Sequence, residues 1–315
     1  MNPSSLVRVN VVLPVYKPQL NEYERISLMQ CVRVLGHYPI WLAAPHSLDI
    51  SAYREILPTI QARTFDDSYF ADVQGYNRLM LSEEFYKAFS DQEYVLIHQL
   101  DAFVFRDELA YWCLQEYDYV GAPWLRDRDF TGTMDRIDFM IRKRIATLFN
   151  LKKPDGVTPR EIISLNTVGN GGLTLRRIPA MLRCLEPFKT KIAEYEGIHT
   201  HQYHEDVFWS VEVNRYWPRL RIPNYRKALH FSVEFFPNGP SSITITVSCR
   251  LDVMPGIFTE RTTGDLFLPA TVIKFKCLYD FKSPTDDLHC ALHLQWQSLS
   301  ACAVAKSART GTTTG

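Results

Sequence analysis

The sequence predicts an α/β protein with a mostly parallel central sheet flanked by helices, and two observations carry this prediction. Runs of β-branched and aliphatic residues, such as 9–15 and 94–100, are typical of central strands that are covered on both faces. Segments of helical periodicity, such as 21–35 and 73–89, alternate with these runs. Alternating strands and helices are typical of parallel sheets with right-handed crossovers.

The first half of the chain accounts for most of the expected sheet. Strands are expected, in chain order, at residues 9–15, 39–43, 63–65 and 94–100. Helices are expected between them at 21–35, 51–57 and 73–89. Pro14 marks the end of the first strand, because proline cannot donate to a strand ladder. Ligands of such sheets bind beyond the carboxyl ends of the strands, so a site is expected there.

The second half is less regular. A strand at 117–124 runs into a Gly/Pro turn, and a glycine-rich turn at 167–172 leads into a strand that ends at 175. Helices are expected at 137–149, 178–185 and 205–213. Residues 237–315 form an atypical tail with Ser/Thr-rich runs and a low-complexity end, SARTGTTTG. The sequence does not distinguish whether this tail is natively structured, disordered or the product of a shifted reading frame.

Composition excludes several classes of protein. The 35 basic and 35 acidic residues balance, so no nucleic-acid partner is expected. Seven cysteines without a CxxC pair argue against a zinc ribbon and a disulfide scaffold. The N-terminal apolar run is too short to span a bilayer, which favours a cytoplasmic protein. The basic helix with Arg142, Lys143 and Arg144 allows at most peripheral membrane contact, and a solvated helix face is favoured.

Acidic residues at two places in the sequence are candidates for cation binding or catalysis. Asp101 follows a buried strand, and a carboxylate there is costly unless it is paired or binds a cation. The alternatives are a turn cap or an ion pair with Arg106. Glu205 and Asp206 begin a helix, and either carboxylate is a candidate general base. Stabilisation of the helix dipole is the alternative for this pair.

The glycine-rich segment VGNGG contains Gly169, Gly171 and Gly172. Glycine permits positive φ and close approach of the backbone to a ligand. The segment lacks the GxGxxG spacing and a P-loop lysine, which excludes a Rossmann dinucleotide fingerprint and a Walker motif. A turn that shapes a pocket and a plain tight turn both fit.

Four segments together resemble glycosyltransferases of the GT-A type: VNVVLPVY, HQLDAFVF, VGNGGLTLR and HEDVFW. The chain is most similar to a family catalogued only as a domain of unknown function, which shares the QLDAF, YDYVGAPW, GNGGL and EDVFW pattern. The likeness covers residues 9–236. It implies a GT-A-like, Rossmann-like domain at 1–236, with a nucleotide-binding half at 1–110 and an acceptor half at 111–236.

The resemblance implies that a sugar moves from a nucleotide-sugar donor to a glycan or other hydroxyl acceptor, with inversion and with Mn²⁺ or Mg²⁺ bound at Asp101. Gln99 stands where the family's Asp-x-Asp motif has its first carboxylate, and an amide is a poor ligand for a hard cation. Metal dependence therefore stays open, and Gln99 is a candidate nucleotide contact. As the base, Asp206 is favoured over Glu205.

Three further candidates concern donor and acceptor binding. Tyr16 lies where a nucleotide base would stack, and Arg78 could neutralise a phosphate. Trp124 could stack on a sugar, with Gly171 and Gly172 shaping the pocket. A solvated arginine and a core tryptophan are the alternatives.

Two rival functions remain. A nucleotidyltransferase would be expected to carry a basic glycine-rich loop near the first strand, and VVLPVYKPQLNEYE has no glycine. A non-catalytic carbohydrate- or nucleotide-binding relative is kept open by Gln99. A hydrolase is disfavoured because the sequence has no GxSxG motif.

Overall fold

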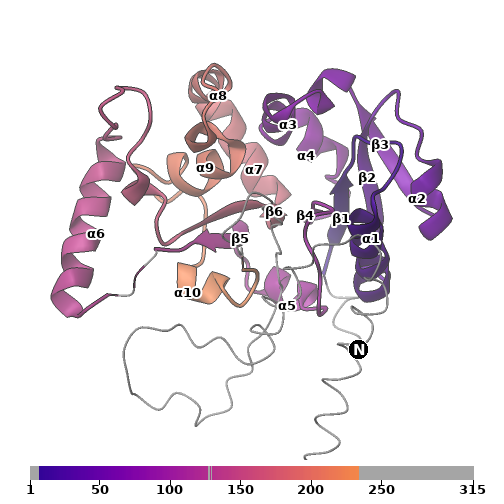
Figure 1. The fold of residues 1–315 in the computed structure, drawn as a ribbon, viewed down its shortest axis with the longest axis horizontal. Coiled ribbons are helices and arrows are strands. Elements are labelled where there is room, and N and C mark those ends of the chain that lie inside the picture. Colours follow the sequence, from indigo (N-terminus) through magenta and orange to yellow (C-terminus); the bar gives the residue numbers. More distant parts are fainter. Residues whose placement is uncertain (1–6, 127, 129, 234–315) are drawn as a thin grey trace, which may run out of the picture. The chain divides into compact units, whose positions relative to one another are not determined.

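The computed structural model describes residues 7–126, 128 and 130–233. Within these residues a six-stranded sheet has the order β3-β2-β1-β4-β6-β5 (Figure 1). The strands are β1 Val9–Pro14, β2 Ile40–Pro45, β3 Gln61–Phe65, β4 Tyr94–His98, β5 Tyr119–Trp124 and β6 Thr167–Arg177. Strands β1 to β4 run parallel, and β6 runs antiparallel to both β4 and β5. The predicted α/β class with a mostly parallel sheet is confirmed.

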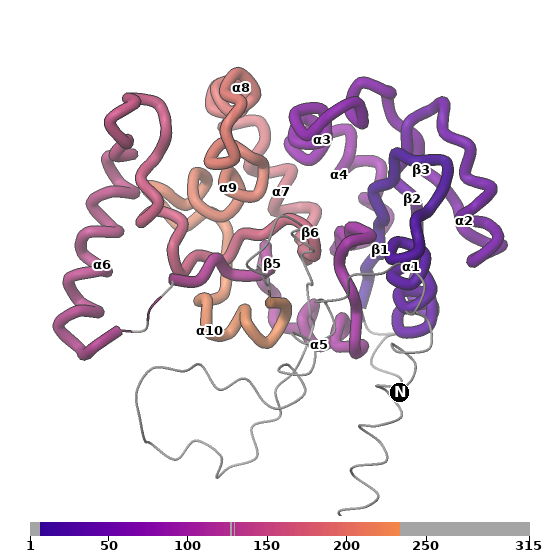
Figure 2. The backbone as a smooth tube through the Cα atoms, viewed as in Figure 1, coloured from indigo at the N-terminus to yellow at the C-terminus, as the bar shows by residue number. Residues whose placement is uncertain are grey.

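Helices cover both faces of the sheet, as Figures 1 and 2 show. Their bounds are α1 Glu22–Leu35, α2 Ser51–Ile56, α3 Val73–Met80, α4 Glu83–Ala88, α5 Leu109–Leu114, α6 Thr133–Leu148, α7 Ile178–Leu185, α8 Lys189–Glu196, α9 Glu205–Val207 and α10 Tyr225–Ala228. One buried cluster joins the sheet to α1, α2 and α5. A second cluster joins the other face to α3, α4 and α7. Both faces are therefore apolar, which explains the continuous apolar runs of the strands.

Local sequence sets the start of α1. Asn21 and Glu24 form a capping box, in which Asn21 Oδ1 accepts from the Glu24 N–H and Glu24 Oε2 accepts from the Asn21 N–H, each at 2.9 Å. Leu28, Cys31 and Leu35 then recur at helical spacing and are buried against the sheet. The helix predicted at 21–35 is confirmed.

The single helix predicted at 73–89 is wrong, because two helices occupy this segment. Helix α3 ends at Met80, and α4 begins at Glu83. Between them, the Ser82 hydroxyl accepts from the Phe85 N–H at 3.1 Å and caps α4. Apolar residues on both sides of the break pack into the same cluster, so the periodicity alone does not reveal it.

The turn predicted at the glycine-rich segment 167–172 is also wrong, because residues 167–177 form one continuous strand. The pairing of β6 with β5 shifts register between Val120 and Ala122 and again between Ala122 and Pro123. Among the described glycines only Gly156 has positive φ. The glycines of β6 therefore do not serve a left-handed backbone conformation, and Gly169 and Gly171 allow close packing instead.

The remaining differences concern helix bounds. Helix α6 begins at Thr133, four residues before the predicted start at Ile137. Beyond α9 the chain continues as a π-helical turn, Phe208–Glu212, within the predicted helix 205–213.

The tail at 237–315 lies outside the described residues. None of the described helices is long and apolar enough to cross a membrane.

Candidate active site

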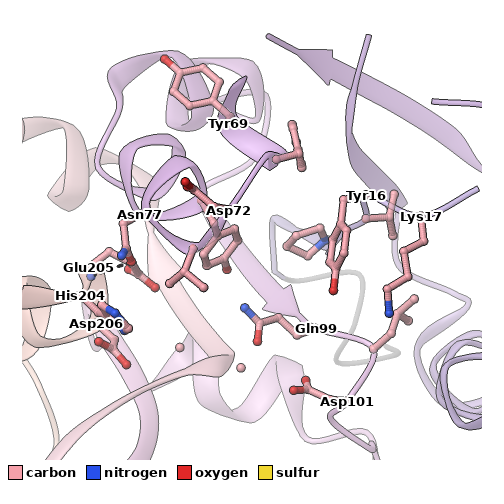
Figure 3. A pocket seen from close by; sticks show the side chains of 18 of the residues that line it. Tyr16, Lys17, Tyr69, Asp72, Asn77, Gln99, Asp101, His204, Glu205 and Asp206 are labelled. Atoms are coloured by element: carbon pink, nitrogen blue, oxygen red, sulfur yellow. Dashed lines mark hydrogen bonds between the residues drawn. The ribbon is translucent and has the colours of Figure 1, made fainter. Parts of the chain in front are cut away.

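A cavity of about 570 Å³ opens at the carboxyl ends of β1 and β4. These two strands are neighbours at the point where the strand order reverses, which is where open α/β sheets bind ligands. Seven of the nine predicted site residues line the cavity: Tyr16, Gln99, Asp101, Gly171, Gly172, Glu205 and Asp206. In Figure 3, Gln99 and Asp101 lie between Tyr16 on one side and the segment His204–Asp206 on the other.

The other two predicted residues do not line this cavity. Arg78 donates to the Ser68 carbonyl at 3.2 Å and lines a separate recess with Glu84 and Glu196. Trp124 lies over the backbone of Gly169, where an added Cβ would come within 2.2 Å of the indole ring. The structure therefore gives Trp124 a packing partner inside the β5–β6 pair.

Asp101 stands in a turn just beyond β4. The Ala102 N–H donates to the Gln99 carbonyl at 2.9 Å, and the Gln99 N–H donates to the Gly172 carbonyl at 2.8 Å. These two bonds fix the start of the turn against β6. Partial burial raises the pKa of the Asp101 carboxyl above its usual range, and the charge of Glu24 adds to this, although a backbone hydrogen bond opposes it. Asp101 is nevertheless exposed at the cavity, so its carboxylate is accessible to a ligand.

Glu205 is bound to a buried arginine beneath the cavity. Arg176 Nη2 lies 2.9 Å from Glu205 Oε1, and Arg176 Nη1 lies 2.9 Å from Glu205 Oε2. Both side chains are almost fully buried. The same guanidinium donates to the Tyr86 hydroxyl at 3.0 Å. The Glu205 carboxylate is therefore engaged as the anion of a structural ion pair.

Asp206, the next residue, lies at the cavity wall beside Gly171. An ideal Cβ on Gly171 would lie 2.8 Å from Glu205 Oε1 and 3.9 Å from Asp206 Oδ2. Oδ1 of Asp206 accepts from the Val207 N–H at 2.8 Å. Gly171 is therefore the position at which β6 can approach the acidic pair, because a side chain there would meet the fixed carboxylate of Glu205.

The cavity residues that were not predicted include the polar side chains of Lys17, Asp72, Asn77 and His204. Lys17 Nζ lies 2.8 Å from Glu24 Oε1. Asp72 caps α3 by accepting from the Gly75 N–H at 2.7 Å, a role that its place before a helix could have indicated. Asn77 Oδ1 accepts from the Glu205 N–H at 3.1 Å, although 128 residues separate the two. No local pattern in the sequence indicates this contact.

The cavity wall is acidic. Five of its residues carry carboxylates: Glu24, Asp72, Asp101, Glu205 and Asp206. Lys17 and the underlying Arg176 supply two cations, so the carboxylates exceed these cations by three. Over the described part of the chain, no group of three or more His, Cys, Asp or Glu side chains is arranged to hold a metal ion. The excess of carboxylates is unfavourable for an anionic ligand that enters without a cation.

Comparison with known proteins identifies a family. Residues 59–244 match the family described as "Protein of unknown function (DUF5672)", a segment that includes Asp101, the glycines of β6 and the acidic pair. No curated protein has a significant match to this sequence.

Solved structures with a similar arrangement of elements include two enzymes. The apo form of mouse xyloside xylosyltransferase 1 is 14% identical with a TM-score of 0.40, and the match covers 69% of this chain and 84% of that one. The 4-diphosphocytidyl-2C-methyl-D-erythritol synthase of Anaerococcus prevotii DSM 20548 is 13% identical with a TM-score of 0.37, and the match covers 62% and 86%. Structural similarity with identities and TM-scores this low supports no inference about function.

Proposed function

The chain belongs to the family described as a protein of unknown function (DUF5672), and from the geometry of its cavity we propose that it is a glycosyltransferase. It would move a sugar from a nucleotide-sugar donor to the hydroxyl of a glycan or other acceptor. One observation carries the proposal. The cavity at the strand-order reversal brings Tyr16, Asp101 and Asp206 together from three distant parts of the chain.

The donor would lie beside Tyr16 and Asp101. Tyr16 is 61% exposed beside the end of β1, so its ring is accessible for stacking on a nucleotide base. Lys17, next in the chain, would face the diphosphate together with the turn at Gln99. Fixed polar groups on both sides of a ligand orient it and lower the entropy cost of reaction.

The acidic wall favours a donor that brings Mn²⁺ or Mg²⁺ with it. The Asp101 carboxylate is a hard oxygen ligand of the kind these ions take, and the Gln99 amide oxygen is a poorer one. They are too few to hold an ion alone, so diphosphate oxygens and water would complete its coordination. Such an ion supplies charge neutralisation for the departing diphosphate. Gln99 would then be a weak ligand or a nucleotide contact.

The acceptor would lie on the side of Asp206. Its carboxylate would take the proton of the acceptor hydroxyl while that oxygen bonds to the anomeric carbon and the bond to the diphosphate breaks, which inverts the configuration. Glu205 is unsuited to this step because its carboxylate is buried in an ion pair with Arg176. Its role would be to fix the start of α9 and, with it, Asp206.

A thermal-shift screen of nucleotide diphosphates and nucleotide-sugars, with and without Mn²⁺, tests the proposal. A ligand at 100 times its Kd stabilises the fold by about 2.7 kcal/mol, which raises the melting temperature measurably. We expect Asp101→Asn to abolish the Mn²⁺-dependent part of this shift, and Gln99→Asp to increase it. Asp138→Asn is the matched control, because Asp138 is exposed on α6.

Two outcomes would contradict the proposal. Metal-dependent binding that persists unchanged in Asp101→Asn would remove Asp101 from the site. Tight nucleotide-sugar binding without release of nucleoside diphosphate, with every acceptor offered, would favour a non-catalytic binding protein.

A further inference from the structure

A recess lies beside the cavity, between α3 and α8. It has a volume of about 480 Å³, which is in the range of small-molecule sites in proteins. Side chains of the turn Asp67–Phe70, of α3, of α4 and of the last residue of α8 line it. Its polar side chains include Asp66, Ser68, Tyr69, Arg78, Glu84 and Glu196. We call this the α3–α8 recess.

The α3–α8 recess adjoins the proposed acceptor side of the cavity. Tyr69 lines both the recess and the cavity. Helix α3 contacts α8 and α9, and the three helices stand together in Figure 1. In Figure 3, Tyr69 lies on the same side of Gln99 as Asp206. Tyr16 and Lys17 lie on the opposite side. A ligand that passes from the cavity over Tyr69 would therefore reach the recess from the acceptor side and not from the donor side.

The recess offers both donors and acceptors of hydrogen bonds. Arg78 Nη2 donates to the Ser68 carbonyl at 3.2 Å, which leaves further N–H groups of the guanidinium for a ligand. The Tyr69 hydroxyl donates to Glu84 Oε2 at 3.3 Å, so the other oxygen of Glu84 can still accept. Desolvation raises the pKa of the Glu196 carboxyl above its usual range, and the charge of Arg78 opposes this rise. The Glu196 carboxylate and the Arg78 guanidinium are therefore close enough to act on one ligand.

We propose that the α3–α8 recess binds a neutral sugar unit of the acceptor, which is therefore an oligosaccharide. A sugar hydroxyl both donates and accepts, so it matches a wall in which carboxylates accept and a guanidinium donates. The ring of Tyr69 supplies an apolar surface for the C–H groups of a sugar. The proposal rests on the proposed function for the identity of the acceptor, but binding in the recess requires no transfer.

The charges of the recess disfavour other ligands. It has carboxylates at Asp66, Glu84 and Glu196, and its one cation is Arg78. This excess of negative charge is unfavourable for a phosphate or an anionic sugar. A metal ion is also disfavoured, because no group of three or more His, Cys, Asp or Glu side chains in the described residues could hold one. A neutral polyhydroxyl ligand is the best match to this lining.

A glycan array tests the proposal, using the fluorescently labelled full chain without donor or metal. The array carries neutral and uronic-acid-containing glycans, from monosaccharides to hexasaccharides. We expect the chain to bind neutral oligosaccharides. Glu196→Ala should weaken this binding by about tenfold, because a hydrogen bond to a charged group is lost. The matched control is Glu194→Ala, because Glu194 is exposed on the same helix and does not line the recess.

Two variants of Tyr69 test the role of the aromatic ring. Tyr69→Ala removes the ring, and we expect it to weaken glycan binding by about tenfold or more. Tyr69→Phe keeps the ring and should retain most of the binding. If Tyr69→Ala does not fold, the comparison of Glu196→Ala with Glu194→Ala still decides the proposal.

Several outcomes would overturn the proposal. They are equal binding by Glu196→Ala and Glu194→Ala, no binding of any neutral oligosaccharide, and stronger binding of uronic-acid-containing glycans. Neutral glycan binding that depends on Glu196, in a chain that transfers no sugar, would support the recess and contradict only the proposed function.

Where transfer occurs, kinetics give a second test. Glu196→Ala should raise KM for the oligosaccharide acceptor about tenfold with little change in kcat. It should leave KM for a monosaccharide acceptor unchanged, because a single sugar does not reach the recess. An equal rise of KM for both acceptors would overturn the proposal, since it would indicate a structural effect on the whole site.

Discussion

Two adjacent carboxylates have different surroundings, and this difference predicts different consequences of mutation. Asp206→Asn keeps the shape of the cavity wall but removes the proposed base. We expect sugar transfer to fall by about 10²–10⁴-fold while nucleotide-sugar binding and the melting temperature stay nearly unchanged. Glu205→Gln should instead lower the free energy of unfolding by about 3–5 kcal/mol, because it leaves Arg176 buried without its anion.

Kinetics and thermal melts of the two variants distinguish these effects. If Asp206→Asn retains full transfer activity while a stably folded Glu205→Gln loses it, the base is Glu205. If both variants retain activity, neither carboxylate is the base. The acidic pair then only stabilises the start of α9 through the helix dipole.

His98 is expected to make the core sensitive to acid. It is fully buried in β4, neither ring nitrogen has a hydrogen-bond partner among the described residues, and burial lowers its pKa to about 4. Between pH 6.5 and 4 the unfolded chain therefore binds a proton that the folded chain does not. Folding stability should fall over this range by about 3 kcal/mol as the pH decreases.

The variant His98→Leu isolates this contribution. Its free energy of unfolding, measured by urea denaturation at several pH values, should lack the part of the acid dependence that wild type shows between pH 6.5 and 4. Parallel pH profiles for the two proteins would contradict the assignment.

The types of the site residues were predictable, but their partners were not. An acidic residue after an apolar strand indicated Asp101, and the motif HEDVFW indicated Glu205 and Asp206. The ion pair of Glu205 with Arg176 joins residues 29 positions apart, so only the folded chain reveals it. The sequence therefore indicated residues that the fold brings to one cavity, but not the contacts that these residues make there.

At the scale of elements, the β5–β6 pair depends on glycine for close packing. Trp124 covers Gly169, and the Gly169 carbonyl accepts from the Tyr119 hydroxyl at 2.7 Å. Gly169→Ala should lower the free energy of unfolding by about 1–3 kcal/mol, because its methyl group would overlap the indole. In the background of Trp124→Ala the same substitution should cost much less. Equal costs in both backgrounds, measured by chemical denaturation, would show that the ring is not the obstacle.

Apolar periodicity predicted most elements but missed interruptions between them. Residues on both sides of Ser82 pack into one cluster, so their spacing resembles a single helix. Its hydroxyl cap and the two glutamates that follow, Glu83 and Glu84, are the physical signals for a new helix. In β6 the opposite error arose, because three glycines suggested a turn in a segment that is a strand. Two of them permit close approach instead, Gly169 to Trp124 and Gly171 to Glu205.

For the whole molecule, alternation of strands and helices correctly indicated a parallel sheet, and hence a site at the carboxyl ends of its strands. The antiparallel β6 could not be predicted in this way. Strand direction depends on where the chain returns to the sheet, and the 42 residues between Trp124 and Thr167 have no alternating pattern that fixes it. β6 nevertheless carries Gly171 and Gly172 to the cavity, so one wall of the cavity depends on this strand.

The position of the last buried residues in the described part of the chain predicts where the chain can be shortened. Phe231 is buried, and its ring packs edge-on against Trp112 of α5 with centroids 5.3 Å apart. A chain ending at residue 237 retains this contact, so we expect it to unfold cooperatively at a temperature close to that of the full chain. A chain ending at residue 229 should lose about 3–5 kcal/mol, as expected when a buried phenylalanine is removed from a core. Phe231→Ala in the chain ending at 237 should cause a similar loss, which assigns the effect to this side chain. Loss of the cooperative transition in the chain ending at 237, measured by calorimetry, would instead show that later residues complete the fold.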